Sequence, residues 1–226
     1  MIVFDKVTKI FRSANGLRTV LRDASVSFDP RFDYGILGTN GAGKSTLLRL
    51  ISGAIPVTSG RIRRRGRISW PLGFASFVSG QLTGRENAAF IARLYGAPVA
   101  RVEAFVADFS ELGPYFSMPT ATYSSGMRAR FSFALSMAIE FDYYLVDELT
   151  AVGDARFNDK CARAFAERRE YARVIMVSHQ MASIRRFCSA GAILDRGRLT
   201  LYDSLDDAAM AYQNLLNNPH SGGRSS

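Results

Sequence analysis

The sequence contains few of the residues that build disulfide scaffolds or metal sites. Only two cysteines occur, Cys161 and Cys188, and they lie far apart without the spacing of metal ligands. Because disulfides are rare in the cytosol, we expect both to be reduced thiols. The two histidines, His179 and His220, are too few for a histidine-rich metal site. The composition therefore predicts a cytosolic protein without a cysteine- or histidine-rich metal centre.

Long apolar runs and a secretory signal are also missing. The most apolar stretch, residues 131–146, is interrupted by serine and acidic side chains, whereas a membrane helix needs about 20 apolar residues. The N-terminus has no basic region followed by an apolar core. We therefore expect that the chain neither spans nor crosses a membrane by itself. Its 47% hydrophobic content is ample for the core of one domain.

The chain has an excess of positive charge. It carries 29 lysines and arginines against 20 acidic residues, a net charge of +9, and part of the excess lies in residues 61–67, Arg-Ile-Arg-Arg-Arg-Gly-Arg. Such a cluster could bind nucleic acid or the anionic face of a membrane, or it could form a solvated turn between two short strands. Charge alone does not separate these interpretations, and we favour the turn.

One segment carries a motif for a specific chemistry. Residues 38–46, Gly-Thr-Asn-Gly-Ala-Gly-Lys-Ser-Thr, match G-x-x-x-x-G-K-[ST]. Gly41 and Gly43 can adopt backbone angles that other residues avoid, so that the amides turn inward around an anion. Lys44 places a charge near the β- and γ-phosphates of a nucleotide, and the Ser45 hydroxyl can ligate Mg²⁺. The motif predicts a nucleoside triphosphate site formed by Gly38, Asn40, Gly41, Gly43, Lys44, Ser45 and Thr46.

The order of predicted elements indicates an α/β protein. Alternating polar and apolar residues over 1–30 predict antiparallel strands joined around Asn15-Gly16, and an apolar strand over 34–37 enters the phosphate loop. A helical pattern over about 84–138 looks like a lobe inserted into a sheet protein. Alternation of strands and helices then resumes, which implies a parallel sheet with active groups at the carboxyl ends of its strands.

These patterns also predict where individual elements lie. We expect helices from Ser45 onward and over 86–95, 99–112, 125–140, 155–171, 181–187 and 205–216, strands near 61–69 and over 143–146 and 173–177, and a hairpin over 192–201. We predict one domain over residues 1–216, with its helical subdomain at about 77–140. Residues 217–226, rich in glycine, serine and asparagine, are expected to be a disordered tail.

Further candidate site residues follow two of the predicted strands. Asp147 and Glu148 end the apolar strand over 143–146, where Asp147 can hold Mg²⁺ through water and Glu148 can orient or deprotonate an attacking water. His179 closes the next predicted strand. Because neighbouring parallel strands present their carboxyl ends at one edge, we expect His179 to lie near Glu148 and to sense the γ-phosphate.

A serine-rich segment, Ser124-Ser125-Gly126, opens the long helix that precedes the Asp-Glu strand. A helix start of this kind can bind an anion, or its serine can be a plain N-cap. The order of phosphate loop, helical lobe, serine-rich helix, Asp-Glu strand and histidine resembles the nucleotide-binding domain of ATP-binding cassette (ABC) transporters over nearly the whole chain. The resemblance implies a P-loop NTPase fold with a RecA-like core, an antiparallel β subdomain and an inserted helical subdomain.

The resemblance also implies roles for several residues. Ser124, Ser125 and Gly126 would form a signature that acts in trans on the ATP of a second copy, so that two copies sandwich two ATP molecules with Mg²⁺. Asp154 matches the loop that crosses this interface, and Phe11 matches the aromatic residue that stacks on adenine, although a core phenylalanine is the alternative.

The sequence departs from the family pattern in two places. Ser125 and Met127 replace the first glycine and the glutamine of the usual Leu-Ser-Gly-Gly-Gln signature. A glutamine is also missing where the family carries its glutamine loop, near Phe74, and Gln81 lies too close to the following helix to replace it. The contribution of that loop to metal ligation and phosphate sensing is therefore left open.

Four segments, residues 68–74, 82–87, 122–128 and 152–157, are similar to the ATPases of bacterial capsular polysaccharide exporters. This finer resemblance implies an ATP-hydrolysing dimer at the cytoplasmic face of the inner membrane. It would work beneath a separate permease dimer of ABC-2 type, with periplasmic and outer-membrane capsule export proteins beyond it, and move a lipid-linked glycan. Trp70, Phe74 and Phe77 are candidates for a socket that receives a permease helix, or else for the core of the lobe.

Other functions remain as alternatives. O-antigen and teichoic-acid exporter ATPases share the segments 82–87 and 123–127. A soluble ABC ATPase acting on ribosomes or nucleic acid is more distant, because such proteins carry two cassettes or long coiled coils that this sequence lacks, and we expect no nucleic acid partner. A regulatory GTPase is disfavoured since no Asn-Lys-x-Asp motif occurs.

Overall fold

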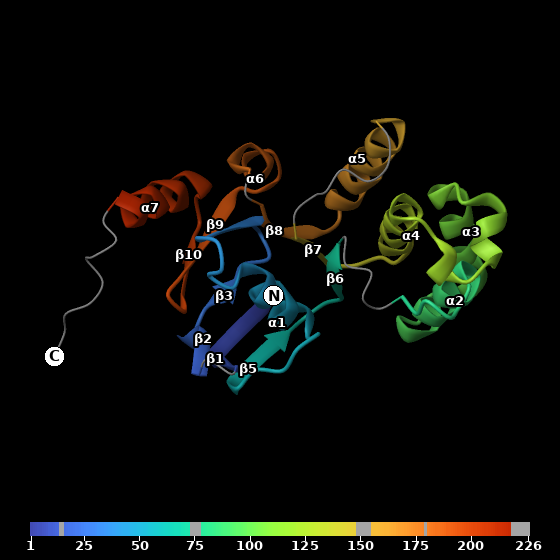
Figure 1. Ribbon diagram of the computed structural model, residues 1–226. Coiled ribbons are helices and arrows are strands. Elements are labelled where there is room, and N and C mark those ends of the chain that lie inside the picture. Colours follow the sequence, from blue (N-terminus) through green and yellow to red (C-terminus); the bar gives the residue numbers. More distant parts are fainter. Residues whose placement is uncertain (14–15, 73–77, 148–154, 179, 218–226) are drawn as a thin grey trace. The chain divides into compact units, whose positions relative to one another are not determined.

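The computed structural model describes residues 1–13, 16–72, 78–147, 155–178 and 180–217. The chain divides into two compact units (Figure 1). One is formed by Met1–Ile68, Leu145–Glu148 and Arg173–Ser226, and the other by Ser69–Tyr144 and Leu149–Ala172. No helix in the described part of the chain is long and apolar enough to cross a membrane. The subdomain limits expected from the sequence stay a prediction.

The first unit contains a four-stranded antiparallel sheet built around its first strand. The strands are β1 (Ile2–Ser13), β2 (Gly16–Ala24), β3 (Ser27–Phe28) and β5 (Ser59–Arg64), and β1 pairs antiparallel with the other three. Apolar side chains along β1, such as Ile2 and Phe4, are buried, which is the reason for the alternating pattern. The expected antiparallel strands are confirmed.

The single strand expected near 61–69 is wrong in its extent. The segment forms two strands of different sheets, β5 and β6 (Ile68–Leu72). Gly66 lies between them with a φ of 102°, an angle that suits glycine and breaks an extended strand. Residues 61–64 of the basic segment belong to β5, and residues 65–67 link the two strands, so the favoured interpretation of a turn is confirmed only for residues 65–67.

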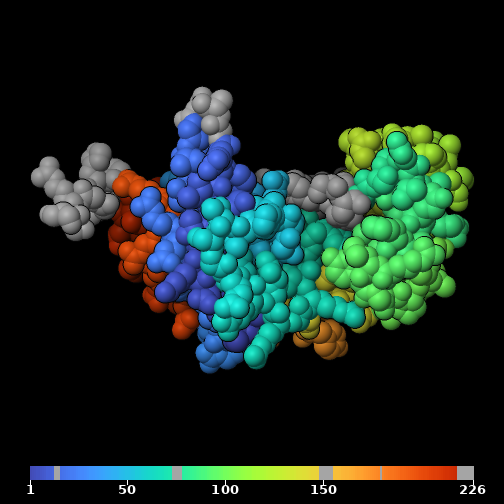
Figure 2. Space-filling model, turned by 90° about the horizontal axis from the view of Figure 1, so that it is seen from below, coloured from blue at the N-terminus to red at the C-terminus, as the bar shows by residue number. Residues whose placement is uncertain are grey.

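The arginines of β5 have specific partners in the first unit. Arg61 and Arg63 lie 3.6 and 3.3 Å from the Asp5 carboxylate. Arg64 donates to the carbonyls of Leu50 (2.6 Å) and Ile51 (2.7 Å), near the end of helix α1 (Lys44–Ser52), where a cation is favoured. Partial burial lowers the pKa of Arg64. The blue and teal surface in Figure 2 belongs to this N-terminal part of the unit.

A second, six-stranded sheet has the order β10-β9-β4-β8-β7-β6. Its further strands are β4 (Tyr34–Leu37), β7 (Tyr143–Asp147), β8 (Arg173–Val177), β9 (Ala190–Asp195) and β10 (Arg198–Tyr202). β4 pairs parallel with both β8 and β9, while β9 and β10 form an antiparallel hairpin. All four residues of β4 are buried, as expected for an inner parallel strand. The expected parallel sheet and hairpin are confirmed.

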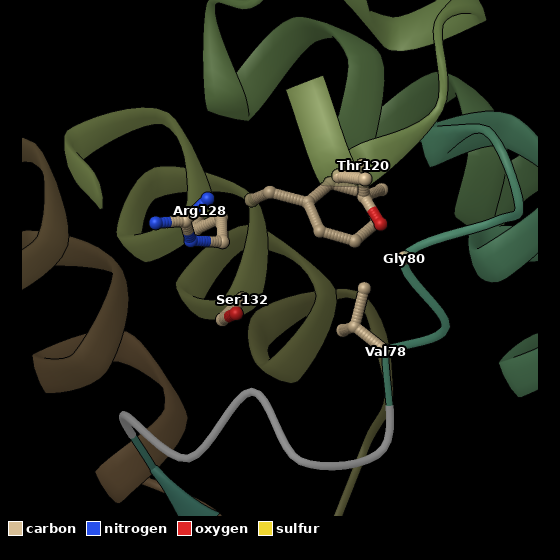
Figure 3. A pocket seen from close by; sticks show the side chains of 7 residues that line it. Val78, Gly80, Thr120, Arg128 and Ser132 are labelled. Atoms are coloured by element: carbon tan, nitrogen blue, oxygen red, sulfur yellow. The ribbon is translucent and has the colours of Figure 1, made fainter. Parts of the chain in front are cut away.

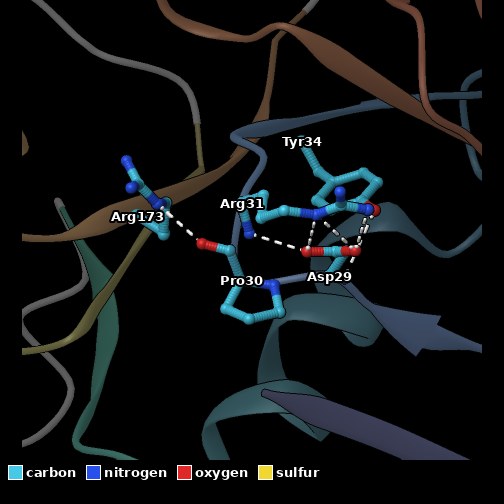
Figure 4. A network of polar contacts seen from close by, with 5 residues as sticks. All are labelled: Asp29, Pro30, Arg31, Tyr34 and Arg173. Atoms are coloured by element: carbon cyan, nitrogen blue, oxygen red, sulfur yellow. Dashed lines mark hydrogen bonds and ion pairs between the residues drawn. The ribbon is translucent and has the colours of Figure 1, made fainter.

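A polar network holds the turn that leads into β4 (Figure 4). The Asp29 carboxylate accepts from the backbone N–H of Arg31 and from its guanidinium, each at 2.8 Å. These bonds hold the pKa of Asp29 below its usual value. Arg173, the first residue of β8, donates from Nε to the carbonyl of Pro30 at 2.8 Å. This bond joins the segment before β4 to the start of its neighbour β8. It helps to hold in place the strand that leads into the phosphate loop.

The remaining helices of the first unit are α6 (Met181–Phe187) and α7 (Leu205–Asn217). The second unit contains α2 (Gly84–Leu94), α3 (Val99–Ser110), α4 (Ser125–Ala138), α5 (Ala155–Arg169) and two short 3₁₀ turns, Gly113–Ser117 and Thr120–Thr122. In Figure 1, α2, α3 and α4 lie side by side. The helical lobe expected here is present.

Trp70 is partly exposed and packs against other residues of the second unit. Its ring makes edge contacts with Tyr95 and Phe141, at centroid distances of 5.5 and 5.3 Å. Its Nε1 donates to the Ser136 hydroxyl on α4 at 2.9 Å. These contacts fix the ring within the unit, and the docking socket stays a prediction. Phe74 and Phe77, the other two candidates, lie outside the described residues.

A salt-bridge network joins three helices of the second unit. Glu111 ends α3 in a left-handed conformation, with a φ of 55°. Its carboxylate accepts from Lys160 on α5 at 2.9 Å and lies 3.7 Å from Arg130 on α4. The hydrogen bond from Lys160 is the main reason that the pKa of Glu111 lies below its ordinary value. α3 ends at Ser110, two residues earlier than expected, because the left-handed Glu111 does not continue the helix.

Candidate functional site

The predicted phosphate loop joins β4 to α1 in the first unit. Gly41 and Gly43 have φ values of 77° and 105°, which residues with a Cβ rarely adopt. A Cβ at Gly43 would also lie 2.2 Å from Cγ1 of Val20, so this position requires glycine for its space as well as its angle. Gly43 caps α1 without any side-chain hydrogen bond. The strand–loop–helix arrangement expected from the sequence is confirmed.

Lys44 is held inside the loop. Its Nζ donates to the carbonyls of Gly38 (2.8 Å) and Thr39 (3.1 Å), and only 7% of the residue is exposed. Lys44 is also the first residue of α1, whose start has no side-chain cap and whose dipole favours an anion. This combination of a cation and uncapped amides can bind a phosphate chain.

Arg18 is a second cation at the loop, and the sequence analysis missed it. Its Nη2 donates to the carbonyl of Gly41 at 2.5 Å. Arg18 lies on β2, where it pairs with Phe11 of β1. The turn expected at Asn15-Gly16 could have indicated this register, because it sets which residues of a hairpin face each other. No pattern in the sequence predicted the contact between Arg18 and Gly41.

Phe11 has an exposed ring. It is 39% exposed, and Nζ of Lys9 lies 4.7 Å from its ring centroid. A buried phenylalanine, the alternative considered for this position, is therefore not what the structure has. Since Phe11 is the strand partner of Arg18, an exposed aromatic face lies on the side of the first unit from which Arg18 reaches the loop. Its stacking on adenine stays a prediction.

The carboxyl ends of the parallel strands carry the other expected residues. Asp147 ends β7 and is partly exposed, while Ser178 follows Val177, which pairs with Ile36 of β4. Glu148, Asp154 and His179 lie outside the described residues, so their roles stay predictions. Of the residues predicted at this edge of the sheet, the structure therefore describes Asp147 alone.

The oxygen donors present fit a magnesium ion that is completed by phosphates and water. Ser45, on the first turn of α1, and Asp147 both belong to the first unit and are partly exposed. Magnesium prefers oxygen ligands and is usually held by one or two protein groups plus phosphate oxygens and water. Among the described residues, no three histidine, cysteine or acidic side chains gather as a metal site.

The serine-rich signature opens α4 in the second unit. Ser124 is the N-cap, and its hydroxyl accepts from the N–H of Met127 at 3.2 Å. Ser124, Ser125 and Gly126 are all exposed. A Cβ at Gly126 would meet nothing closer than the Ser124 hydroxyl, at 4.0 Å. The segment is thus a capped helix start whose outer side is open, which leaves room for contact with a ligand or another chain.

A small pocket lies beside α4 within the second unit (Figure 3). Arg128 and Ser132 project into it from α4, and Val78 and Thr120 lie across from them. Its volume is about 120 Å³, well below the several hundred Å³ of typical ligand sites. We therefore do not assign the nucleotide to this pocket, and the phosphate loop remains the candidate site.

Comparison with known families supports this assignment. Residues 21–151 match the model of the ABC transporter family. Solved structures with this fold include an ATP-binding subunit of an ABC transporter (TM-score 0.74, 21% identity, 94% of this chain and 93% of that chain). They also include a dimeric ATP-binding cassette in a post-hydrolysis state with ADP and phosphate (TM-score 0.70, 21% identity, 91% and 99%). The expected α/β fold of an ABC nucleotide-binding domain is confirmed.

Curated relatives are more similar in sequence to this chain than these solved structures are. The capsule polysaccharide export ATP-binding protein CtrD of Neisseria meningitidis serogroup B is 46% identical over 95% of this chain and 100% of its own length. The polysialic acid transport ATP-binding protein KpsT of Escherichia coli is 45% identical (94% and 99%), and the ATP-binding protein BexA of Haemophilus influenzae is 44% identical (94% and 98%). The chain therefore belongs to the ABC transporter family, within its group of capsule polysaccharide export ATP-binding proteins.

Proposed function

We propose that this chain is the ATP-hydrolysing subunit of a transporter that exports capsular polysaccharide across a bacterial inner membrane. One observation carries the proposal. The chain aligns over about its full length with proteins named for capsule polysaccharide export and polysialic acid transport, and it has an ordered phosphate loop with Lys44 held inside it. The ATPase of an O-antigen or teichoic-acid exporter would have a similar site. The names of the relatives favour capsule polysaccharide as the cargo.

ATP is bound in this proposal by the phosphate loop, from Gly38 and Asn40 to Thr46, with adenine stacked on Phe11. Lys44 neutralises the β- and γ-phosphates, and the uncapped amides at the start of α1 receive their oxygens. Magnesium, held by Ser45 and through water by Asp147, supplies charge neutralisation at these phosphates when bound.

Hydrolysis is assigned to the residues that follow β7 and β8. Glu148 orients the attacking water and accepts its proton, and His179 contacts the γ-phosphate. Both residues follow strands whose inner parts are buried. The loop near Phe74 replaces the family's glutamine loop and is left without a role.

The active form is a dimer that sandwiches two ATP molecules. The exposed start of α4 supports this, since Ser124, Ser125 and Gly126 present an open surface to a second copy. Asp154 crosses the same interface. The solved post-hydrolysis cassette with ADP and phosphate is itself described as dimeric.

The dimer acts beneath two copies of an integral membrane permease of ABC-2 type, at the cytoplasmic face of the membrane. The relatives are named as ATP-binding components of export or transport, which supports a separate membrane partner. Periplasmic and outer-membrane export proteins would act beyond the permease on a lipid-linked glycan. Nucleic acid is not part of the proposal, because three arginines of the basic segment already have partners in the first unit.

The experiment is substitution of Glu148→Gln in the purified chain. We expect ATP binding to be retained, hydrolysis to become slow and a closed dimer to accumulate, as seen by size-exclusion chromatography with ATP. Turnover equal to that of the wild type would refute the catalytic assignment. For the transport assignment, the gene should restore surface capsule to a strain that lacks the corresponding ATP-binding subunit, and the Glu148→Gln gene should not. Failure of the wild-type gene, tested together with its own permease, would refute capsule export.

A further inference from the structure

Arg18 extends from the antiparallel sheet onto the phosphate loop. It is exposed, and its Nη2 donates to the carbonyl of Gly41 at 2.5 Å. A Cβ at Gly41 would find Nη2 of Arg18 at 3.6 Å and no other atom within 4 Å. The guanidinium therefore lies at the outer side of a loop whose glycine backbone is otherwise open.

The register of the sheet places this cation between two other candidate contacts of the nucleotide. Arg18 pairs with Phe11 across β1 and β2, and paired residues in such sheets have Cβ atoms about 4.5–5.5 Å apart. Lys44 occupies the inner side of the loop, bound to Gly38 and Thr39. The loop thus has a buried cation on one side and an exposed cation on the side of Phe11.

The charge of Arg18 is not neutralised by a carboxylate. In the part of the chain that the structure describes, no acidic side chain is paired with it, and the Gly41 carbonyl is its hydrogen-bond partner. A guanidinium has five N–H donors. Bonds from it to phosphate oxygens are charge-assisted and about twice as strong as bonds to neutral acceptors. The position therefore suits an anionic ligand better than the single carbonyl that it now holds.

We propose that Arg18 is a second nucleotide-binding cation, whose guanidinium binds the α- and β-phosphates on the adenine side while Lys44 serves the β- and γ-phosphates. The inference rests on the proposed ATP site and adds a residue to it. Since the γ-phosphate lies at the other end of the chain of phosphates, Arg18 contributes equally to binding ATP and ADP. It contributes nothing to binding adenosine.

The test is equilibrium binding of unlabelled adenosine, ADP and ATP to the full chain, measured by calorimetry. We expect Arg18→Ala to weaken ADP and ATP binding by about tenfold each, the size of one charge-assisted hydrogen bond. Adenosine binding should not change. Arg22→Ala is the matched control, because it removes the same charge from the same strand, where the backbone N–H of Arg22 bonds Gly197 rather than the loop. This variant should bind like the wild type.

Two further variants separate the effect of the Arg18 charge from that of its hydrogen bond to the Gly41 carbonyl. Arg18→Gln keeps a polar side chain with N–H donors but removes the charge, so we expect it to bind ATP as weakly as Arg18→Ala. Arg18→Lys keeps a charge and should recover part of the affinity. Full affinity in Arg18→Gln would overturn the proposal and leave Arg18 as a structural brace. A loss for ATP without a loss for ADP would overturn the assignment to the α- and β-phosphates.

Lys44→Ala distinguishes failure of this inference from failure of the proposed function. If Lys44→Ala loses ATP and Arg18→Ala binds like Arg22→Ala, the ATP site stands and the role of Arg18 is wrong. If Lys44→Ala binds ATP normally, the site itself is wrong. Unfolding curves in urea for all variants show whether a weakened variant is still folded.

Discussion

Two helices of this protein begin at predicted anion sites, and they begin in different ways. At the start of α1, Gly43 is left-handed and no side chain caps the amides. At the start of α4, Ser124 is extended and its hydroxyl accepts from Met127. The start of α1 is therefore open to an anion, whereas α4 is already capped by a side chain. We infer that α1 encloses phosphates, and that α4 touches them from outside as part of another copy.

The largest expected contrast is between glycine substitutions at the two helix starts. Gly43→Ala should abolish ATP binding and destabilise the fold, because a non-glycine residue at such an angle costs about 1–3 kcal/mol and its Cβ would lie 2.2 Å from Val20. Gly126→Ala should be stabilising by about 0.5–1 kcal/mol, since alanine favours a helix and the space is open. Urea unfolding and ATP calorimetry measure both.

Equal loss of stability in Gly126→Ala and Gly43→Ala would contradict the expected difference between the two helix starts. Gly126→Ala should still bind ATP as a monomer, while its hydrolysis rate should fall because the added methyl would lie on the proposed dimer surface. Full hydrolysis by this variant would argue against a role of the signature in trans.

The next prediction separates capping from ligand contact at α4. Ser124→Ala removes the N-cap and should cost about 1 kcal/mol of stability. Ser124→Asp keeps a good cap and should keep stability, yet it places a negative charge at the ATP of the partner copy and should abolish hydrolysis. Thermal unfolding and phosphate release are the two measurements.

Thr83 offers a control in the same unit. It caps α2 with a capping box that includes Glu86, and it is not part of the predicted site. Thr83→Ala should lose similar stability, and Thr83→Asp should leave hydrolysis unchanged. If Ser124→Asp hydrolysed ATP as well as Thr83→Asp, Ser124 would be a cap and nothing more.

A third prediction concerns how the far ends of the two helices are held. Arg64 bonds the last carbonyls of α1, whereas α4 is bound near its end by Trp70 through Ser136. Trp70→Phe and Ser136→Ala should each cost about 1 kcal/mol, and the double variant should cost less than the sum because both remove one bond. Additive losses in urea unfolding would show that the bond contributes no stability.

The smallest expected effect is a pH dependence in the second unit. The pKa of Glu111 is lowered in the fold, chiefly by its bond to Lys160, so its contribution to stability is present above the unfolded pKa. It is lost as the pH falls through the folded pKa. Since both side chains are partly exposed, the effect should be small. Glu111→Gln should flatten the acid side of the stability profile, and an unchanged profile would contradict the role of the carboxylate.

Much of the site was predictable because its geometry depends on neighbours in the chain. The loop of residues 38–46 predicted its own strand and helix, and Ser124 predicted the start of α4. Other expectations were wrong in the extent of an element. The strand near 61–69 is divided at Gly66 between two sheets, and α3 stops at Ser110, where the next residue is left-handed.

The sequence by itself determined that this protein has a phosphate loop, a capped signature helix and an α/β order. These features are encoded by glycine angles, serine caps and periodicity over a few residues. Only the tertiary structure decided that Arg18 holds Gly41, that Val20 excludes a side chain at Gly43, and that Trp70 bonds Ser136 on α4. Such contacts join residues 23 to 66 positions apart, and no local pattern specifies them because they exist only once the sheets have formed.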